Sequence, residues 1–190
     1  MLVYTVFIFL LFILTNGYIT QNVEKKIVNN VSQEPLYDLL FEILPNLERF
    51  RLLNDIISIC FIIAALKLTD SKRTLQIMLV IGIIRIAITY LTVFPKSTKS
   101  ACNFYKFSLV GGCHDKILSG HTAMNVVASL QILSLYPQYK YILLPLNLLA
   151  SFLIIASRDH YTIDVVIGYL VSILIFTQFY SKQNIFDMVL

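Results

Sequence analysis

The sequence Ser157-Arg-Asp-His-Tyr-Thr-Ile-Asp164, read together with Ile117-Leu-Ser-Gly-His-Thr122, decides how this 190-residue chain is organised. Each stretch lies where a polar segment meets the start of a long apolar run. His160 and Asp164 are four residues apart, so a helix would place both on one face. The second stretch brings His121 to the expected start of another helix.

The chain has three histidines, at positions 114, 121 and 160, and all lie in or beside these two stretches. Two histidines and an aspartate gathered at helix N-termini suit phosphoryl transfer. One imidazole can attack phosphorus, the carboxylate can hold its tautomer, and the other imidazole can protonate the leaving oxygen. Backbone N–H groups at helix N-termini also bind phosphate. A single histidine here would be an ordinary polar residue at the end of a membrane helix, but the two stretches together favour a reactive site.

The composition indicates an integral membrane protein. Hydrophobic residues make up 57% of the chain and charged residues 14%, whereas a soluble domain of this length carries about 25% charged residues. The apolar residues gather in runs near membrane-spanning length. The net charge of +4 comes without a basic cluster interleaved with aromatic residues, so nucleic acid is not expected as a partner. Three cysteines are too few for a disulfide scaffold.

We predict an all-α fold, a six-helix transmembrane bundle that forms a single domain over residues 1–190. The first apolar run could instead be a signal peptide, although it lacks a basic n-region. The predicted spans are residues 2–19, 52–68, 75–94, 117–136, 141–157 and 160–180.

Two longer polar segments join these spans. Residues 20–51 contain the sequon Asn30-Val-Ser32, which marks a luminal or extracellular surface if it is used. Residues 95–116 carry Cys102 and Cys113, which could form a disulfide in an oxidising compartment. A short amphipathic helix on the membrane is also predicted, from Leu39, Leu40, Ile43 and Leu44.

The six spans place both candidate stretches and both longer loops on one face of the membrane, and a tight basic loop at residues 69–74 on the other. Arg85 lies near the middle of the third span, where a charged residue costs about 2.5–3.5 kcal/mol on insertion scales and usually faces a polar cavity. It either contacts the phosphate of a substrate or forms a structural pair, for which Asp55 is a candidate. A plain count of basic residues would put the site face in the cytosol, although long loops count for less.

Four motifs resemble those of the sphingomyelin synthases, within the wider lipid phosphate phosphatase superfamily. Cys113-His-Asp115 followed by Ser119-Gly-His-Thr122 is similar to their third motif, Cys-Gly-Asp followed by Ser-Gly-His-Thr. His160-Tyr-Thr-Ile-Asp-Val165 is similar to the fourth, His-Tyr-Thr-x-Asp-Val. Pro35-Leu-Tyr-Asp38 resembles the first, Pro-Leu-Pro-Asp. The spacing of the second motif is matched by Arg85, Thr92 and Pro95.

The resemblance implies a lipid phosphate phosphatase-like membrane enzyme whose His-His-Asp triad faces the lumen or the cell exterior. It assigns His160 as the nucleophile, Asp164 as its orienting partner and His121 as the acid and base. The implied reaction moves a phospho-head-group, phosphocholine or a relative, from a glycerophospholipid donor to the primary hydroxyl of ceramide and releases diacylglycerol. No metal or other cofactor is implied. The candidate substrate-binding residues are Arg85, Asp115, Ser119, Gly120 and Arg158.

Departures from the family pattern bear on the head group more than on the chemistry. His114 replaces a glycine of the third motif, and is either a solvated loop histidine, which we favour, or an added phosphate ligand. Tyr37 replaces a proline of the first motif, and Ile88 stands where the second has threonine. Golgi, endoplasmic reticulum and plasma membrane all fit the implied orientation, and a homo-oligomer is compatible with the pattern.

Two alternatives compete with the transferase. A lipid phosphate phosphatase acting on phosphatidic acid-type substrates would use the same triad with water as the acceptor. The phosphatase motif has an arginine six residues before its histidine, whereas Ile154 stands there in this chain and Arg158 is two residues before His160. The second alternative is a non-catalytic membrane scaffold or transporter. The complete triad argues against it, and the broken-helix pairs that mark many transporters are not evident.

Overall fold

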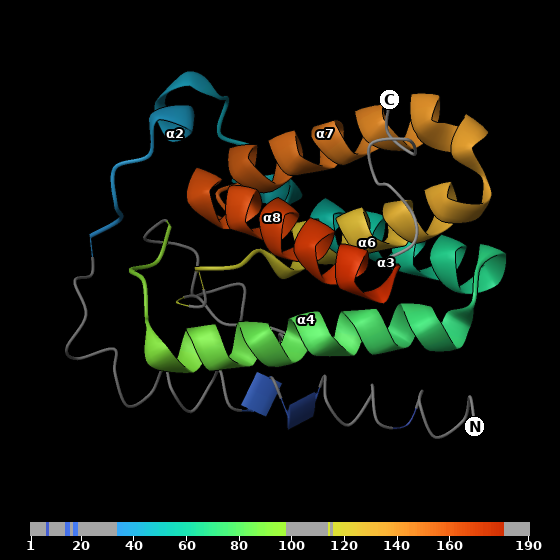
Figure 1. The fold of residues 1–190 in the computed structure, drawn as a ribbon. Coiled ribbons are helices and arrows are strands. Elements are labelled where there is room, and N and C mark those ends of the chain that lie inside the picture. The colour runs from blue at the N-terminus through green and yellow to red at the C-terminus, as the bar shows by residue number, and fades with distance from the viewer. Residues whose placement is uncertain are drawn as a thin grey trace.

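The computed structural model describes residues 7, 14, 15, 17, 18, 34–97, 114 and 116–180. In these residues all regular secondary structure is helical, as predicted. In this part of the chain five long helices run alongside one another, and a short one, α2, lies at one end of the bundle (Figure 1). The elements in chain order are α2 (Leu39–Ile43), the 3-10 helix η2 (Glu48–Phe50), α3 (Leu52–Leu68), α4 (Ser71–Leu91), α6 (Gly120–Leu135), the 3-10 helix η4 (Pro137–Tyr139), α7 (Lys140–Ala156) and α8 (Thr162–Phe179).

The long helices correspond to five of the predicted spans, and the helix over residues 52–68 has the predicted bounds. The prediction of a loop over residues 69–74 was wrong, because α4 already begins at Ser71. The Asp70 side chain caps this helix, and its Oδ1 accepts hydrogen bonds from the backbone N–H groups of Lys72 at 3.0 Å and Arg73 at 3.4 Å. The first predicted span, residues 2–19, lies outside the described residues except at five positions.

Three described helical segments are long and apolar enough to cross a membrane, namely Ser71–Leu91, Pro137–Ala156 and Thr162–Phe179. The outer faces of these segments expose large apolar side chains such as Ile83 and Leu148. Polar side chains are instead buried between the helices, a distribution typical of proteins that lipid surrounds. The chain is therefore a membrane protein with an all-helical bundle. The count of six spans stays a prediction, since α3 and α6 have 17 and 16 residues, fewer than the ~20 of a typical span.

Helix α6 forms the centre of the bundle and packs against α3, α4, α7 and α8. It is buried nearly all round, as expected of a core helix rather than a surface one. Gly168 on α8 allows α6 to approach closely, since a Cβ there would lie 3.1 Å from Cβ of Thr122 and 3.2 Å from the carbonyl oxygen of Ser119. This contact fixes the start of α6 against the first turns of α8, where the candidate residues lie.

The segment before α3 is attached to the start of α8. Asp38 caps α2 by accepting a bond from the Leu40 N–H at 3.0 Å. The same carboxylate accepts bonds from the Thr162 N–H at 2.6 Å and the Thr162 hydroxyl at 2.7 Å. Nearby apolar side chains of this segment, including Leu40 and Phe41, pack against the ends of α7 and α8. A helix is thus present where residues 39–44 predict one, and its Leu40 and Phe41 side chains are partly buried against the bundle. Its position on the membrane surface stays a prediction.

We expect Asp38→Ala to destabilise the fold more than removal of an ordinary helix cap. The substitution removes the local cap and also two hydrogen bonds to Thr162 that join distant segments, so the loss should be about 2–3 kcal/mol. Asp70→Ala, which removes only a local cap at the other end of the bundle, should cost about 1 kcal/mol. Thermal unfolding of the purified variants in detergent measures both effects. Equal losses in the two variants would show that Asp38 acts as a local cap alone.

Candidate active site

His160 lies in the turn between α7 and α8, and Asp164 in the first turn of α8 holds its ring. Nδ1 of His160 is 3.2 Å from Oδ2 of Asp164, and the same oxygen accepts a bond from the Tyr161 N–H at 2.9 Å. The Asp164 side chain is fully buried. Its backbone carbonyl accepts a bond from the Ser119 N–H at 3.1 Å, which joins the two candidate stretches. Because Nδ1 faces the carboxylate, Nε2 of His160 is the nitrogen that faces away from this pair.

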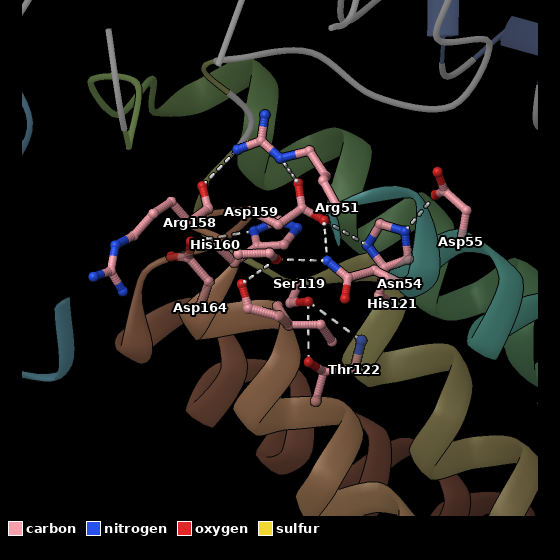
Figure 2. Close-up of polar contacts among 12 residues, drawn as sticks. Arg51, Asn54, Asp55, Ser119, His121, Thr122, Arg158, Asp159, His160 and Asp164 are labelled. Carbon is pink, nitrogen blue, oxygen red and sulfur yellow. Dashed lines mark hydrogen bonds and ion pairs between the residues drawn. The ribbon is translucent and has the colours of Figure 1, made fainter. Parts of the chain in front are cut away.

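His121, the second residue of α6, lies across from His160, with ring centroids 6.2 Å apart and ring planes inclined at 67°. Figure 2 shows the His160 ring between Asp164 and His121. Nε2 of His121 is 2.8 Å from Oδ1 of Asp55, and its Nδ1 is 3.5 Å from Oδ2 of Asp159. Both ring nitrogens therefore face carboxylate oxygens, an arrangement that a doubly protonated imidazole satisfies. The structure thus brings together the three residues of the predicted triad.

Asp159 is a buried carboxylate at this site that the sequence analysis did not single out. Oδ1 of Asp159 lies 3.3 Å from Nε of Arg51, and its Oδ2 accepts a bond from Nδ2 of Asn54 at 3.0 Å. Asp159 is 1% exposed. The only sequence signal for Asp159 was its position directly before His160. Its partners Arg51 and Asn54 lie more than 100 residues earlier in the chain, so spacing could not reveal them.

The positive charges around Asp159 decide its ionisation. Burial alone would raise the pKa of the Asp159 carboxyl. The positive charges of His121, Lys116 and Arg51 outweigh burial and hold this pKa well below its ordinary value. Asp159 is therefore an anion throughout the physiological pH range, and it presents a fixed negative charge to Nδ1 of His121.

The turn that carries Asp159 and His160 is a helix C-cap of the Schellman type. Its N–H groups return to α7: Arg158 donates to the carbonyl of Ile155 at 2.9 Å and Asp159 donates to that of Ile154 at 3.1 Å. Arg158 has a φ of 57°, the left-handed region in which this motif usually has glycine. The backbone carbonyl of Arg158 accepts a bond from Arg51 at 2.7 Å. Contacts of the neighbouring segments thus hold a strained conformation next to His160.

The side chain of Arg158, a predicted substrate-binding residue, extends toward α2 and away from the histidines (Figure 2). Its guanidinium donates to the carbonyls of Phe41 at 2.5 Å and Leu44 at 3.0 Å. The same group lies 4.6 Å from the centre of the Phe41 ring. Burial lowers the pKa of this guanidinium, while nearby carboxylates act in the opposite direction. These contacts account for an arginine at a position where glycine would relieve the backbone.

Three further predicted residues lie together at the start of α6. Ser119 is the N-cap: its hydroxyl accepts from the Thr122 N–H at 3.2 Å and from the Thr122 hydroxyl at 3.0 Å. Arg85 is buried, and its Nε donates to the carbonyl of Leu118 at 3.2 Å. Gly120 lies against this side chain, since a Cβ there would lie 3.4 Å from Nε of Arg85, at ordinary contact distance. The Asp55 carboxylate, considered above as a partner of Arg85, contacts His121.

The remaining sequence predictions either lie outside the described residues or differ from the structure. Asp115, Asn30, Cys102 and Cys113 lie outside the described residues. The expectation of a solvated loop histidine at position 114 was wrong: His114 is 2% exposed, and its Nδ1 is 2.9 Å from the carbonyl oxygen of Phe94.

One atom each from His121, Asp159 and His160 lie within 4.8 Å of one another, a grouping that could hold a metal ion. Arg51 contacts the same Asp159 carboxylate, and the Lys116 ammonium donates to the Asp159 backbone carbonyl at 2.5 Å. These permanent positive charges oppose a bound cation and favour an anion. A phosphate group therefore suits this cluster better than a metal ion does.

Comparison with known proteins relates this part of the chain to lipid phosphotransferases. Residues 112–182 match the family described as PAP2 superfamily C-terminal. The chain is similar to phosphatidylcholine:ceramide cholinephosphotransferase 1 of Homo sapiens and of Mus musculus, with 33% identity over 76 residues in both. The same enzyme of Gallus gallus is 30% identical over 76 residues. Each match covers 38% of this chain and 18% of the relative. These matches confirm the resemblance to the sphingomyelin synthases that the motifs indicate, within the PAP2 superfamily that residues 112–182 match.

Proposed function

We propose that this protein transfers a phospho-head-group from a glycerophospholipid to ceramide through a histidine nucleophile. The observation that supports it most is the His160–Asp164 pair, at 3.2 Å, facing His121 at the starts of two adjoining helices. The PAP2 match supports phosphotransferase or phosphatase chemistry in general. The relatives act on phosphatidylcholine and ceramide according to their names, and this chain would use substrates of the same classes.

In the first half of the proposed reaction, Nε2 of His160 attacks the phosphorus of the donor. A nitrogen–phosphorus bond forms, and the bond from phosphorus to the glycerol oxygen breaks. His121 gives its proton to that oxygen, so that neutral diacylglycerol leaves. Asp164 stabilises the positive charge that develops on the His160 ring through the contact at Nδ1.

In the second half, the primary hydroxyl of ceramide attacks phosphorus. His121, now neutral, takes the hydroxyl proton while the new oxygen–phosphorus bond forms and the nitrogen–phosphorus bond breaks. Both histidines return to their starting protonation states. Asp55 and Asp159 on either side of His121 would favour its protonated form and keep its ring in place between the two half-reactions.

The remaining site residues would bind the substrate or shape the site, and would take no part in bond making or proton transfer. Arg85 would contact the phosphate or acyl-glycerol region of the donor, with its Nε anchored on the carbonyl of Leu118. Ser119 and Gly120 would shape the N-terminus of α6, whose N–H groups suit an anion. Arg158 would act indirectly, by holding α2 against the turn, and Asp115 stays a candidate ligand.

Removal of any triad member should abolish most transfer. His160→Ala, His121→Ala and Asp164→Asn should each lower turnover by about 100-fold or more, since residues that act as a unit fail together. Transfer of a labelled head group to ceramide in detergent–lipid micelles measures this, with Asp70→Asn at the far end of the bundle as the control. Near-normal turnover in two of the three variants would refute the mechanism. Release of free labelled head group by the wild type, without transfer, would indicate the hydrolase instead.

Arg85→Lys should raise the KM for the donor lipid with little change in the amount of folded protein. Lysine keeps the charge but loses the planar fork of the guanidinium. Arg85→Leu should insert readily but lose activity. Asp55→Asn is the comparison, because it changes the contact at His121 and should lower kcat rather than raise the KM. An unchanged donor KM in Arg85→Lys would exclude direct contact with the donor.

The site should face the lumen or the cell exterior, in the Golgi, endoplasmic reticulum or plasma membrane. A glycosylation sequon introduced within residues 97–101 should then produce a glycan-dependent mobility shift in cells. A sequon introduced within residues 69–74, on the opposite face, should remain unmodified. A shift from the second position and none from the first would reverse the orientation.

A further inference from the structure

Lys116 is a buried cation beside the catalytic histidines to which the mechanism above gives no role. The residue is 1% exposed, although lysine is almost never fully buried unless it is paired. Its Nζ donates to the backbone carbonyl of Asp159, the residue directly before His160, at 2.5 Å. This contact holds the ammonium beside the turn that carries the proposed nucleophile.

The charge of Lys116 acts on the reacting groups. It contributes to the low pKa of the Asp159 carboxyl. It is also the largest single charge effect on His160, ahead of those of Asp159, His121 and Arg85. The Asp159 carbonyl that Nζ contacts belongs to the peptide bond leading into His160, so the ammonium also lies close to the phosphorus that His160 would attack. The motif around it, Asp115-x-x-x-Ser119, leaves position 116 unspecified. The lysine at this position is therefore not part of the family motif quoted above.

We propose that Lys116 binds the phosphate oxygens of the lipid substrate and stabilises the negative charge that builds up on them during transfer. This inference rests on the proposed function and adds a phosphate ligand to it. Phosphoryl transfer depends mainly on positioning and on charge stabilisation by fixed cations. Lysine is a common phosphate ligand that acts as a point charge. The carbonyl of Asp159 positions Nζ in advance, so the cation needs no reorganisation when the charge develops.

A purely structural role makes a different forecast. If Lys116 only ties its loop to the carbonyl of Asp159, glutamine should replace it well, because its amide donates to a carbonyl. If the charge is what matters, glutamine should fail and arginine should restore much of the function. Methionine provides a second neutral variant that suits a buried position, since exchange of a buried charge for an apolar residue is often tolerated.

The test uses the full chain in micelles and orthovanadate, which mimics the five-coordinate phosphorus of the transition state. Two quantities are measured for each variant. The first is the vanadate concentration that gives half of the maximal rise in melting temperature, and the second is the kcat/KM for head-group transfer. For Lys116→Gln and Lys116→Met, this vanadate concentration should rise by about tenfold or more, and kcat/KM should fall by a similar factor. Lys116→Arg should lie within about threefold of the wild type. Lys140→Gln, at the start of α7, is the matched control and should change neither quantity.

The outcomes separate this inference from the proposed function. Unchanged vanadate binding and kcat/KM in Lys116→Gln would overturn the inference while the transferase stands. Failure of both neutral variants to yield folded protein would assign Lys116 to the loop tie and would also overturn it. A wild-type protein that binds vanadate but transfers no head group would refute the proposed function, and the melting-temperature series would still decide the role of Lys116.

Discussion

The buried ion pair between Arg51 and Asp159 is the interaction on which the site depends. Charges are removed from water at high cost, and the cost is offset only when partners and hydrogen bonds are in place. One guanidinium here contacts the Asp159 carboxylate at 3.3 Å and the Arg158 carbonyl at 2.7 Å. It thereby holds both the charge and the backbone of a turn that contains a left-handed arginine. Since His160 follows directly, this pair determines where the proposed nucleophile lies.

The central position of α6 provides the second half of the site. A helix packed on several sides has little freedom to shift, because close-packed side chains resist displacement. Gly168 allows α8 to approach α6, and the Ser119 N–H donates to the carbonyl of Asp164. The two stretches that carry the histidines are therefore joined through backbone contacts as well as side chains. The distance between the rings follows from helix packing and does not depend on a flexible loop.

Charge distribution distinguishes this site from a simple pair of histidines. Carboxylates face both nitrogens of His121. Arg51 and Lys116 contact the turn before His160, and Arg85 contacts the segment that leads into α6. The acidic groups hold and polarise one imidazole, and the basic groups favour an anion next to the other. Such an arrangement matches the needs of phosphoryl transfer, in which a proton donor and a fixed positive field act on the same phosphorus.

The sequence by itself determined the features that depend on local spacing. Hydrophobic runs and turn residues predicted five helices within four residues of their ends, because the helical period is a local property of the chain. The pair of His160 and Asp164 was predictable for the same reason, since residues four apart share one helix face.

Only the tertiary structure decided which residues complete the site. Arg51 and Asn54 lie more than 100 residues before Asp159 along the chain, and the direction of the Arg158 side chain depends on where α2 packs. The distance between such groups does not follow from their separation in the sequence. It is determined by how the helices pack around α6.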